Sequence, residues 1–142
     1  MFIGQYSHSL DNKGRVAVPA KFRSQLKKAV VTKGLDSCLF LYPEKEWKKK
    51  ADEIAARPID VADNRALSRT ILAGATEVDF DKQGRIILPE YLRKFAGITK
   101  NVIIAGLYDR LEIWDEEKWN KYQKEMEKNP DEIAEAMGGL KV

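Results

Sequence analysis

The chain carries the sequence Asp11-Asn12-Lys13-Gly14-Arg15-Val16-Ala17-Val18-Pro19-Ala20-Lys21-Phe22-Arg23. The same pattern returns 70 positions later as Asp81-Lys82-Gln83-Gly84-Arg85-Ile86-Ile87-Leu88-Pro89-Glu90-Tyr91-Leu92-Arg93. Aspartate, glycine, arginine, proline and the final arginine recur at the same spacing, and the apolar positions stay apolar. An internal repeat of this kind predicts two similar structural units within one chain.

Each residue type in the motif fits one structural role. The pattern D-x-x-G suits a tight turn in which the aspartate bonds the backbone and the glycine adopts a left-handed conformation. We therefore expect positive φ at Gly14 and Gly84. The arginine then opens a short apolar strand, and the proline ends that strand and begins a helical turn. Each copy therefore predicts a hairpin, made of a strand, a tight loop and a second strand, and then a helical turn.

The repeat is longer than the motif. At an offset of 72, Gly34-Leu35 matches Gly106-Leu107, and Trp47 matches Trp119. A unit this small buries little core alone, so we expect the two halves to pack together. The chain divides into a first repeat at 1–58, a bridging helix at 59–73, a second repeat at 74–128 and a C-terminal helix at 129–142.

Turn residues and apolar runs predict an α+β fold that is rich in strands. Strands are expected at residues 2–10, 15–18, 29–33, 38–42, 75–80, 85–88, 101–105 and 110–114. Longer helices are expected after Pro43, from Asp60 or Asp63, and after Asp115 as N-cap. Apolar helix faces predict burial of Trp47, Trp119 and Met126. Base stacking by the tryptophans is the alternative.

Composition excludes several classes of protein. No apolar run of the sequence approaches the roughly 20 residues that a membrane span needs, and the N-terminal residues do not resemble a signal peptide. Cys38 is the only cysteine, which rules out an internal disulfide and fits a cytoplasmic protein. We expect its side chain to be a small buried hydrophobe.

The sequence offers no site for catalysis. His8 is the only histidine and Cys38 the only cysteine, so neither a zinc site of the usual ligands nor a nucleophile–histidine–acid arrangement is expected. Glycine-rich phosphate loops are also missing from the sequence. We predict a protein that is not an enzyme and has no cofactor, metal or small-molecule substrate.

Charge is distributed unevenly along the chain. Residues 1–70 have a net charge of +6 and residues 71–142 a net charge of −3. The first 33 residues hold seven basic side chains and one acidic one, which favours a surface for a polyanion over an ordinary solvated surface. Arg15 and Arg85 fit either a brace for the turn or a nucleic-acid contact, and the adjacent Lys13 and Lys82 favour the contact.

The doubled D-x-x-G-R and P-x-x-[FL]-R pattern resembles the MraZ family of bacterial transcriptional regulators, in the AbrB/SpoVT superfamily of swapped-hairpin barrels. The resemblance covers nearly the whole chain, from Met1-Phe2-Ile3-Gly4 through both tryptophan helices. It implies a double swapped-hairpin barrel and a homo-oligomeric ring of about eight subunits. It also implies a cytoplasmic, nucleoid-associated protein that binds direct repeats of double-stranded DNA in the promoter of its own division and cell-wall operon.

The resemblance also implies which residues contact DNA. The residues expected to contact DNA are Lys13, Arg15, Arg23, Lys82 and Arg85. The residues expected to shape the loops are Asp11, Gly14, Asp81 and Gly84. Because the second half is net acidic, we expect Arg15 to contribute more to binding than Arg85. The alternatives are an antitoxin-like or adaptor protein that acts through a protein partner, and a purely structural ring.

Overall fold

The structure is a computed structural model and describes residues 1–138. The first half contains β1 (Phe2–Ser9), β2 (Arg15–Ala17), α1 (Ala20–Arg23), β3 (Ala29–Lys33), β4 (Leu39–Pro43), α2 (Glu44–Ala55) and α3 (Ala62–Ile71). The second half contains β5 (Thr76–Val78), β6 (Arg85–Ile87), α4 (Glu90–Ala96), β7 (Asn101–Tyr108), β8 (Leu111–Asp115), α5 (Glu116–Glu127) and α6 (Pro130–Ala136). The expected α+β class and the internal repeat are therefore confirmed.

The main sheet combines strands from both repeats. It has six antiparallel strands in the order β1-β7-β8-β4-β3-β5. The central pair is β4 with β8, where Phe40 faces Glu112 at the equivalent position of the other repeat. Each edge strand pairs with a strand of the other repeat, β1 with β7 and β5 with β3. The order is thus symmetric about a pseudo-twofold axis between β4 and β8.

The two short strands of the motifs pair with each other. β2 and β6 form a separate antiparallel ribbon in which Val16 faces Ile86, its equivalent in the other repeat. The sequence predicts that β1 and β2 form a hairpin across the first loop, and this expectation is wrong. The loop closes tightly, but β1 leaves to join β7 and β2 joins β6. Strand pairing therefore links the repeats instead of separating them.

The core lies between the ribbon, the short helices and the main sheet. Its fully buried members include Val18, Leu88, Leu41 and Leu111, two from each repeat. Cys38 is also fully buried and unpaired, as expected. Because both repeats supply the same core, neither half encloses a separate apolar interior.

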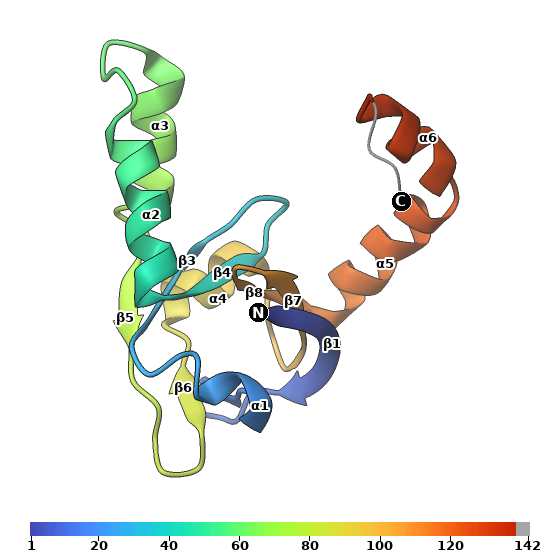
Figure 1. Cartoon of the computed structure of the whole chain (residues 1–142). Helices are drawn as coiled ribbons and strands as arrows, with labels where there is room; N and C mark the ends of the chain where they lie inside the picture. The colour runs from blue at the N-terminus through green and yellow to red at the C-terminus, as the bar shows by residue number, and fades with distance from the viewer. Residues whose placement is uncertain (139–142) are drawn as a thin grey trace.

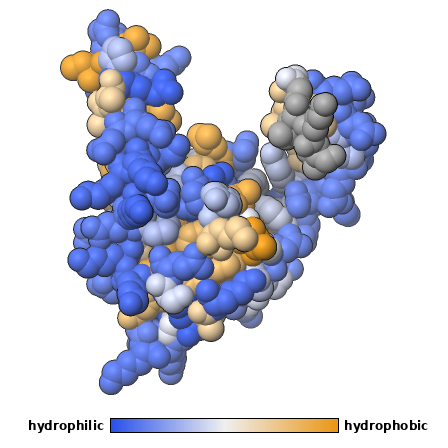
Figure 2. Space-filling view, in the orientation of Figure 1, coloured by the Kyte–Doolittle hydropathy of each residue, from blue (hydrophilic) through white to orange (hydrophobic). Residues whose placement is uncertain are grey.

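The longer helices project from this body. Figure 1 shows α2 and α3 extending from one side and α5 and α6 from the other, with the ribbon at the opposite end. Figure 2 shows apolar residues on the body between the two projections and at the tip of the α2–α3 pair. Exposed apolar side chains at this tip are Ile59 and Val61.

Three expectations about the helices need correction or limits. Trp119 and Met126 are half-buried and not core residues, whereas Trp114 on β8 is 4% exposed. Trp119 packs edge-on against Trp114 and donates from Nε1 to Gln5 Oε1 at 3.1 Å. Trp47 is likewise half-buried. The predicted C-terminal helix is α6, and residues 139–142 of that prediction lie outside the described residues.

The predicted caps have different outcomes. Asp115 caps α5 by accepting from the Lys118 backbone N–H at 3.3 Å, as expected. For α3 the N-cap is Val61, so the expectation of an aspartate is wrong. The turn before α3 is held instead by Asn64, which donates to the Pro58 carbonyl at 2.9 Å. This contact fastens the preceding turn to α3, and within the described chain the helix has no side-chain cap hydrogen bond at its N-terminus.

The shared core predicts a large effect at Leu88. Leu88→Ala removes a side chain that is 0% exposed, and it should lower the free energy of unfolding by about 2–5 kcal/mol. Ile87, the preceding residue, is 58% exposed, so Ile87→Ala should change it by about 0.5 kcal/mol or less. Urea unfolding of both variants provides the measurement. Equal effects at the two positions would contradict this assignment of the core.

Candidate nucleic-acid interface

Asp11 organises the first motif loop. Its Oδ1 accepts from the backbone N–H groups of Lys13 and Arg15, both at 2.9 Å. Its Oδ2 accepts from Arg15 Nε at 2.6 Å. The Gly14 N–H closes the turn on the Asp11 carbonyl at 3.1 Å, and Gly14 has the expected positive φ of 75°. One carboxylate therefore fixes both the turn and the arginine that leaves it.

The second loop has the same geometry. Asp81 accepts from the backbone N–H groups of Gln83 and Arg85 at 2.9 Å and from Arg85 Nε at 2.8 Å. Gly84 has φ of 74°, again as expected. The Arg15 and Arg85 side chains are 28% and 27% exposed. Each guanidinium is held at Nε, and each arginine side chain keeps about a quarter of its surface exposed.

The β2–β6 ribbon brings the two loops together. The Val18 N–H donates to the Gly84 carbonyl at 3.1 Å, and the Leu88 N–H donates to the Gly14 carbonyl at 2.9 Å. Arg85 Nη1 also lies 3.6 Å from Asp11 Oδ2, an ion pair between the repeats. The loops thus lie side by side at the end of the molecule that faces away from the helical projections (Figure 1).

A second arginine in each motif packs on the loop of the other repeat. Arg23 Nε donates to the Val18 carbonyl at 2.8 Å, and Arg93 Nε donates to the Leu88 carbonyl at 3.0 Å. A Cβ on Gly14 would lie 3.1 Å from Arg93 Cζ, and a Cβ on Gly84 would overlap the Arg23 guanidinium. Both glycines are therefore required by backbone conformation and by close packing.

This arrangement changes the account of the predicted site residues. Arg15 and Arg85 are brought together, and Lys13 and Lys82 are exposed in their loops. Arg23 lies beside the second loop and not beside its own. The expectation that the first loop has the more basic surroundings was based on residues that are close to it in sequence. In the folded chain, basic residues that follow the first loop in sequence lie beside the second loop. The role of all five residues in DNA binding stays a prediction.

Sequence reasoning missed two residues near the loops. Arg93 is the repeat equivalent of Arg23 and was identifiable from the repeat alone. Lys27 lies beside the second loop, and it follows α1 at a position where the second repeat has Gly97. Because the repeat gives no matching lysine, only the folded chain reveals the position of Lys27.

Both loop aspartates have a lowered side-chain pKa. The Arg15 backbone N–H contributes most to lowering the pKa of Asp11 from 3.8 to about 2, and the Arg15 side chain adds to it. The pKa of Asp81 is lowered for the same reason, with the Arg85 backbone N–H as the largest cause. Both carboxylates stay charged at neutral pH, so they keep their arginines in place.

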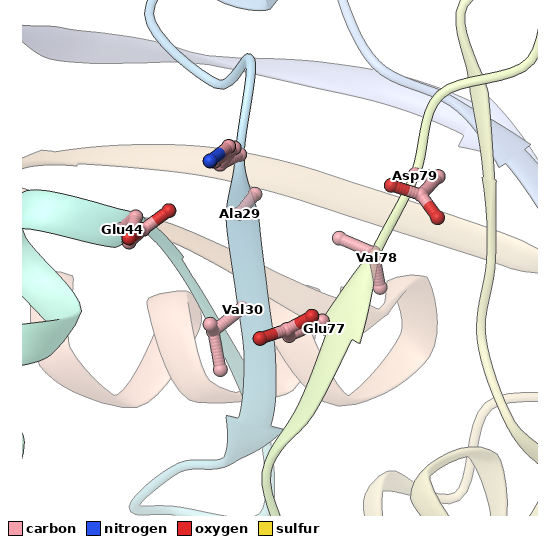
Figure 3. A pocket seen from close by; sticks show the side chains of 7 residues that line it. Ala29, Val30, Glu44, Glu77, Val78 and Asp79 are labelled. Carbon is pink, nitrogen blue, oxygen red and sulfur yellow. The ribbon is translucent and has the colours of Figure 1, made fainter.

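A pocket elsewhere on the described chain does not match a site of this kind. Figure 3 shows a pocket beside β3 and β5 whose rim carries the carboxylates of Glu44, Glu77 and Asp79, with Lys28. That rim would repel a polyanion. Within residues 1–138 no three His, Cys, Asp or Glu side chains gather as metal ligands. No helix in the same range is long and apolar enough to cross a membrane.

Comparison with known proteins gives one family. The family described as "MraZ protein, putative antitoxin-like" matches residues 1–70 and again residues 71–139. A relative from Natranaerobius thermophilus is 51% identical over 136 residues, 95% of each chain. Relatives from Carboxydothermus hydrogenoformans and Syntrophomonas wolfei are 50% and 48% identical over 96% and 99% of each chain. All three are named transcriptional regulator MraZ.

The fold and the paired loops define a two-repeat α+β protein with one arginine loop in each half. The chain belongs to the MraZ family, as the resemblance of its motifs indicated. The curated members are named as transcriptional regulators, so this is a family of regulators and not of enzymes.

The arginine contacts predict unequal costs for alanine at the two glycines. An L-residue in the left-handed region costs about 1–2 kcal/mol, so Gly14→Ala and Gly84→Ala should both destabilise the protein. Gly84→Ala should cost more, because its Cβ would overlap the Arg23 guanidinium and displace it, whereas a Cβ on Gly14 would lie 3.1 Å from Arg93 Cζ. Urea unfolding of both variants measures the difference. Equal losses would show that the closer arginine contact at Gly84 adds nothing beyond the cost at Gly14.

The lowered pKa of Asp11 predicts a loss of stability in acid. Because the folded pKa is about 2 and the ordinary value is 3.8, the contribution is present above 3.8 and is lost as the pH falls towards 2. Asp11→Asn keeps a carbonyl acceptor for the turn but does not titrate. Between these pH values the unfolding free energy of the wild type should fall more steeply than that of Asp11→Asn. Parallel curves would contradict the prediction.

Proposed function

We propose that the protein is a sequence-specific DNA-binding transcriptional regulator that acts on the promoter of its own operon. The observation that carries the proposal is the pair of motif loops, which present two arginines, each hydrogen-bonded to an aspartate, side by side at one end of the folded molecule. Arginine is the residue best suited to phosphate oxygens and to the O6 and N7 edge of guanine. The names of the family's members support the regulatory role.

Rigidity of the loops supports the proposal. Each arginine is fixed at Nε by an aspartate, and each loop is bonded to the strand of the other repeat. A side chain that is already ordered loses less conformational entropy when it binds. The exposed Lys13 and Lys82 would add contacts to phosphates. In this proposal Arg15 and Arg85 specify bases, and the lysines position the loops on the duplex.

We propose a ring-shaped homo-oligomer of about eight subunits as the active form. Apolar side chains are exposed on the helical projections, among them Ile59, Val61, Ile133 and Met137. In the described chain, α5 contains no fully buried residue. A neighbouring subunit would cover these surfaces, and a ring would repeat the loops along one rim and raise their effective concentration.

The finer description of the fold belongs to the same proposal. The strand exchange between repeats supports a double swapped-hairpin barrel, closed by the β2–β6 ribbon below the main sheet. The proposal also includes the division of the chain into two repeats, at 1–58 and 74–128, with a bridging helix at 59–73 and a C-terminal helix at 129–142. Binding to the chromosome would place the protein at the nucleoid in the cytoplasm.

Arginine substitutions test the proposed function. Arg15→Ala and Arg85→Ala should each weaken binding to the DNA upstream of the gene, by about 1–3 kcal/mol for each guanine contact that is lost. Arg69→Ala is the matched control, because Arg69 is exposed on α3, away from the loops. Footprinting and titration of this DNA give the measurement, and light scattering checks that each variant keeps its assembly.

Three results would count against the proposal. Undiminished binding by both loop variants would show that the motif only braces its turns. A wild-type protein that leaves no footprint but retains a protein partner would favour the antitoxin-like or adaptor function. A mass near 16.2 kDa at micromolar concentration would exclude the ring.

A further inference from the structure

A small pocket opens beside the second motif loop. One wall is formed by Arg23 and Lys27 of the first repeat. The other wall is formed by residues 79–82 and Gly84 of the second repeat. Because β2 pairs with β6, the helical turn of one repeat lies against the loop of the other. The pocket is therefore composite, with cations from both halves of the chain.

We infer that this pocket binds a DNA backbone phosphate through Arg23, Lys27 and Lys82, and we call this phosphate-binding site the seat. The inference rests on the proposed function, because it assigns a phosphate contact within the same loop face. It adds Lys27 to the interface and gives Arg23 a position at the second loop.

The three cations are available to an anion. Arg23 is held by Nε on the Val18 carbonyl, which orients the guanidinium beside Gly84 in the wall of the pocket. Within residues 1–138, none of the three cations lies within 4.0 Å of a carboxylate. Lys27 and Lys82 are exposed. The pocket therefore holds positive charge that no carboxylate of the described chain neutralises by contact, and one of its cations, Arg23, is oriented by a hydrogen bond.

Two carboxylates line the same pocket, and their states differ. The Asp81 carboxylate already accepts hydrogen bonds from Arg85 Nε and from two backbone N–H groups. Asp79 is exposed and has no such partners among the described residues. Three cations thus face one free and one paired carboxylate. The free carboxylate of Asp79 repels a phosphate. Its removal should therefore strengthen binding, whereas removal of a lysine should weaken it.

The seat exists at only one of the two loops. At the equivalent positions of the first loop, Lys27 is replaced by Gly97 and Lys82 by Asn12. Arg93 packs on Gly14 as Arg23 packs on Gly84, but neither equivalent sequence position carries a lysine, and the Lys118 ammonium beside Gly97 donates to the Ala96 carbonyl at 3.1 Å. The second loop should therefore anchor the backbone, although it belongs to the more acidic half of the sequence.

Salt titrations of binding test the seat. Lys27→Gln and Lys82→Gln should each reduce the slope of log affinity against log salt by about one unit for each phosphate contact removed. The loss should be equal on the upstream DNA and on a scrambled duplex, since a phosphate carries no sequence information. Lys28→Gln is the matched control, because Lys28 is the next residue but lines the acidic pocket of Figure 3. It should leave the slope unchanged.

An aspartate variant tests the seat in the opposite direction. Asp79→Asn removes the free carboxylate from the pocket and should tighten binding to both duplexes. Asp63→Asn, an equal change at an exposed position of α3, should not. Both positions are exposed, so neither variant disturbs the core.

The outcomes separate the seat from the proposed function. Equal losses of slope in the Lys27→Gln, Lys28→Gln and Lys82→Gln variants would overturn the seat, because they would indicate a nonspecific electrostatic attraction between the basic surface and DNA. Unchanged slopes at Lys27 and Lys82, with binding lost in Arg15→Ala, would overturn the seat and leave the proposed function intact. Unchanged binding in the arginine variants as well would remove both.

Discussion

The exchange of strands between the two repeats is the constraint on which the rest of the structure depends. Two hydrogen bonds, from Val18 to Gly84 and from Leu88 to Gly14, join the end of each loop to the opposite strand. The same exchange occurs at the edges of the main sheet, where β1 joins β7 and β5 joins β3. Since every exchange is reciprocal, both halves must fold together and the two loops must face the same way.

This constraint explains why the loops are suited to a shared ligand. In an isolated turn, an aspartate–arginine pair at the surface contributes little and remains mobile. Here each pair lies on a ribbon whose centre is the buried pair Val16 and Ile86. The arginines are therefore positioned by the core. A ligand that spans both loops meets two fixed guanidinium groups, and the lysines around them differ between the loops.

Much of this arrangement was accessible from the sequence. The D-x-x-G spacing predicted the turn and the positive φ of both glycines, and Asp115 was identified as a cap. The partner of each strand was not predictable, because the two repeats have the same residue pattern. A strand could therefore pair equally well with a strand of its own repeat or of the other repeat. For that reason the position of Lys27 beside the second loop was missed. Trp119 was misjudged because the period of a helix does not show whether another element covers its apolar face.

The strand exchange is tested most directly by proton distances across the ribbon. Arg15 faces Ile87, and Ala17 faces Arg85. Since the pairs on either side are hydrogen-bonded, these are the close, non-hydrogen-bonded pairs of an antiparallel ladder. In labelled protein diluted into unlabelled protein, Hα–Hα Overhauser contacts should connect Arg15 with Ile87 and Ala17 with Arg85. Contacts of Ala17 with residues of β1 instead would show an ordinary hairpin and contradict the account.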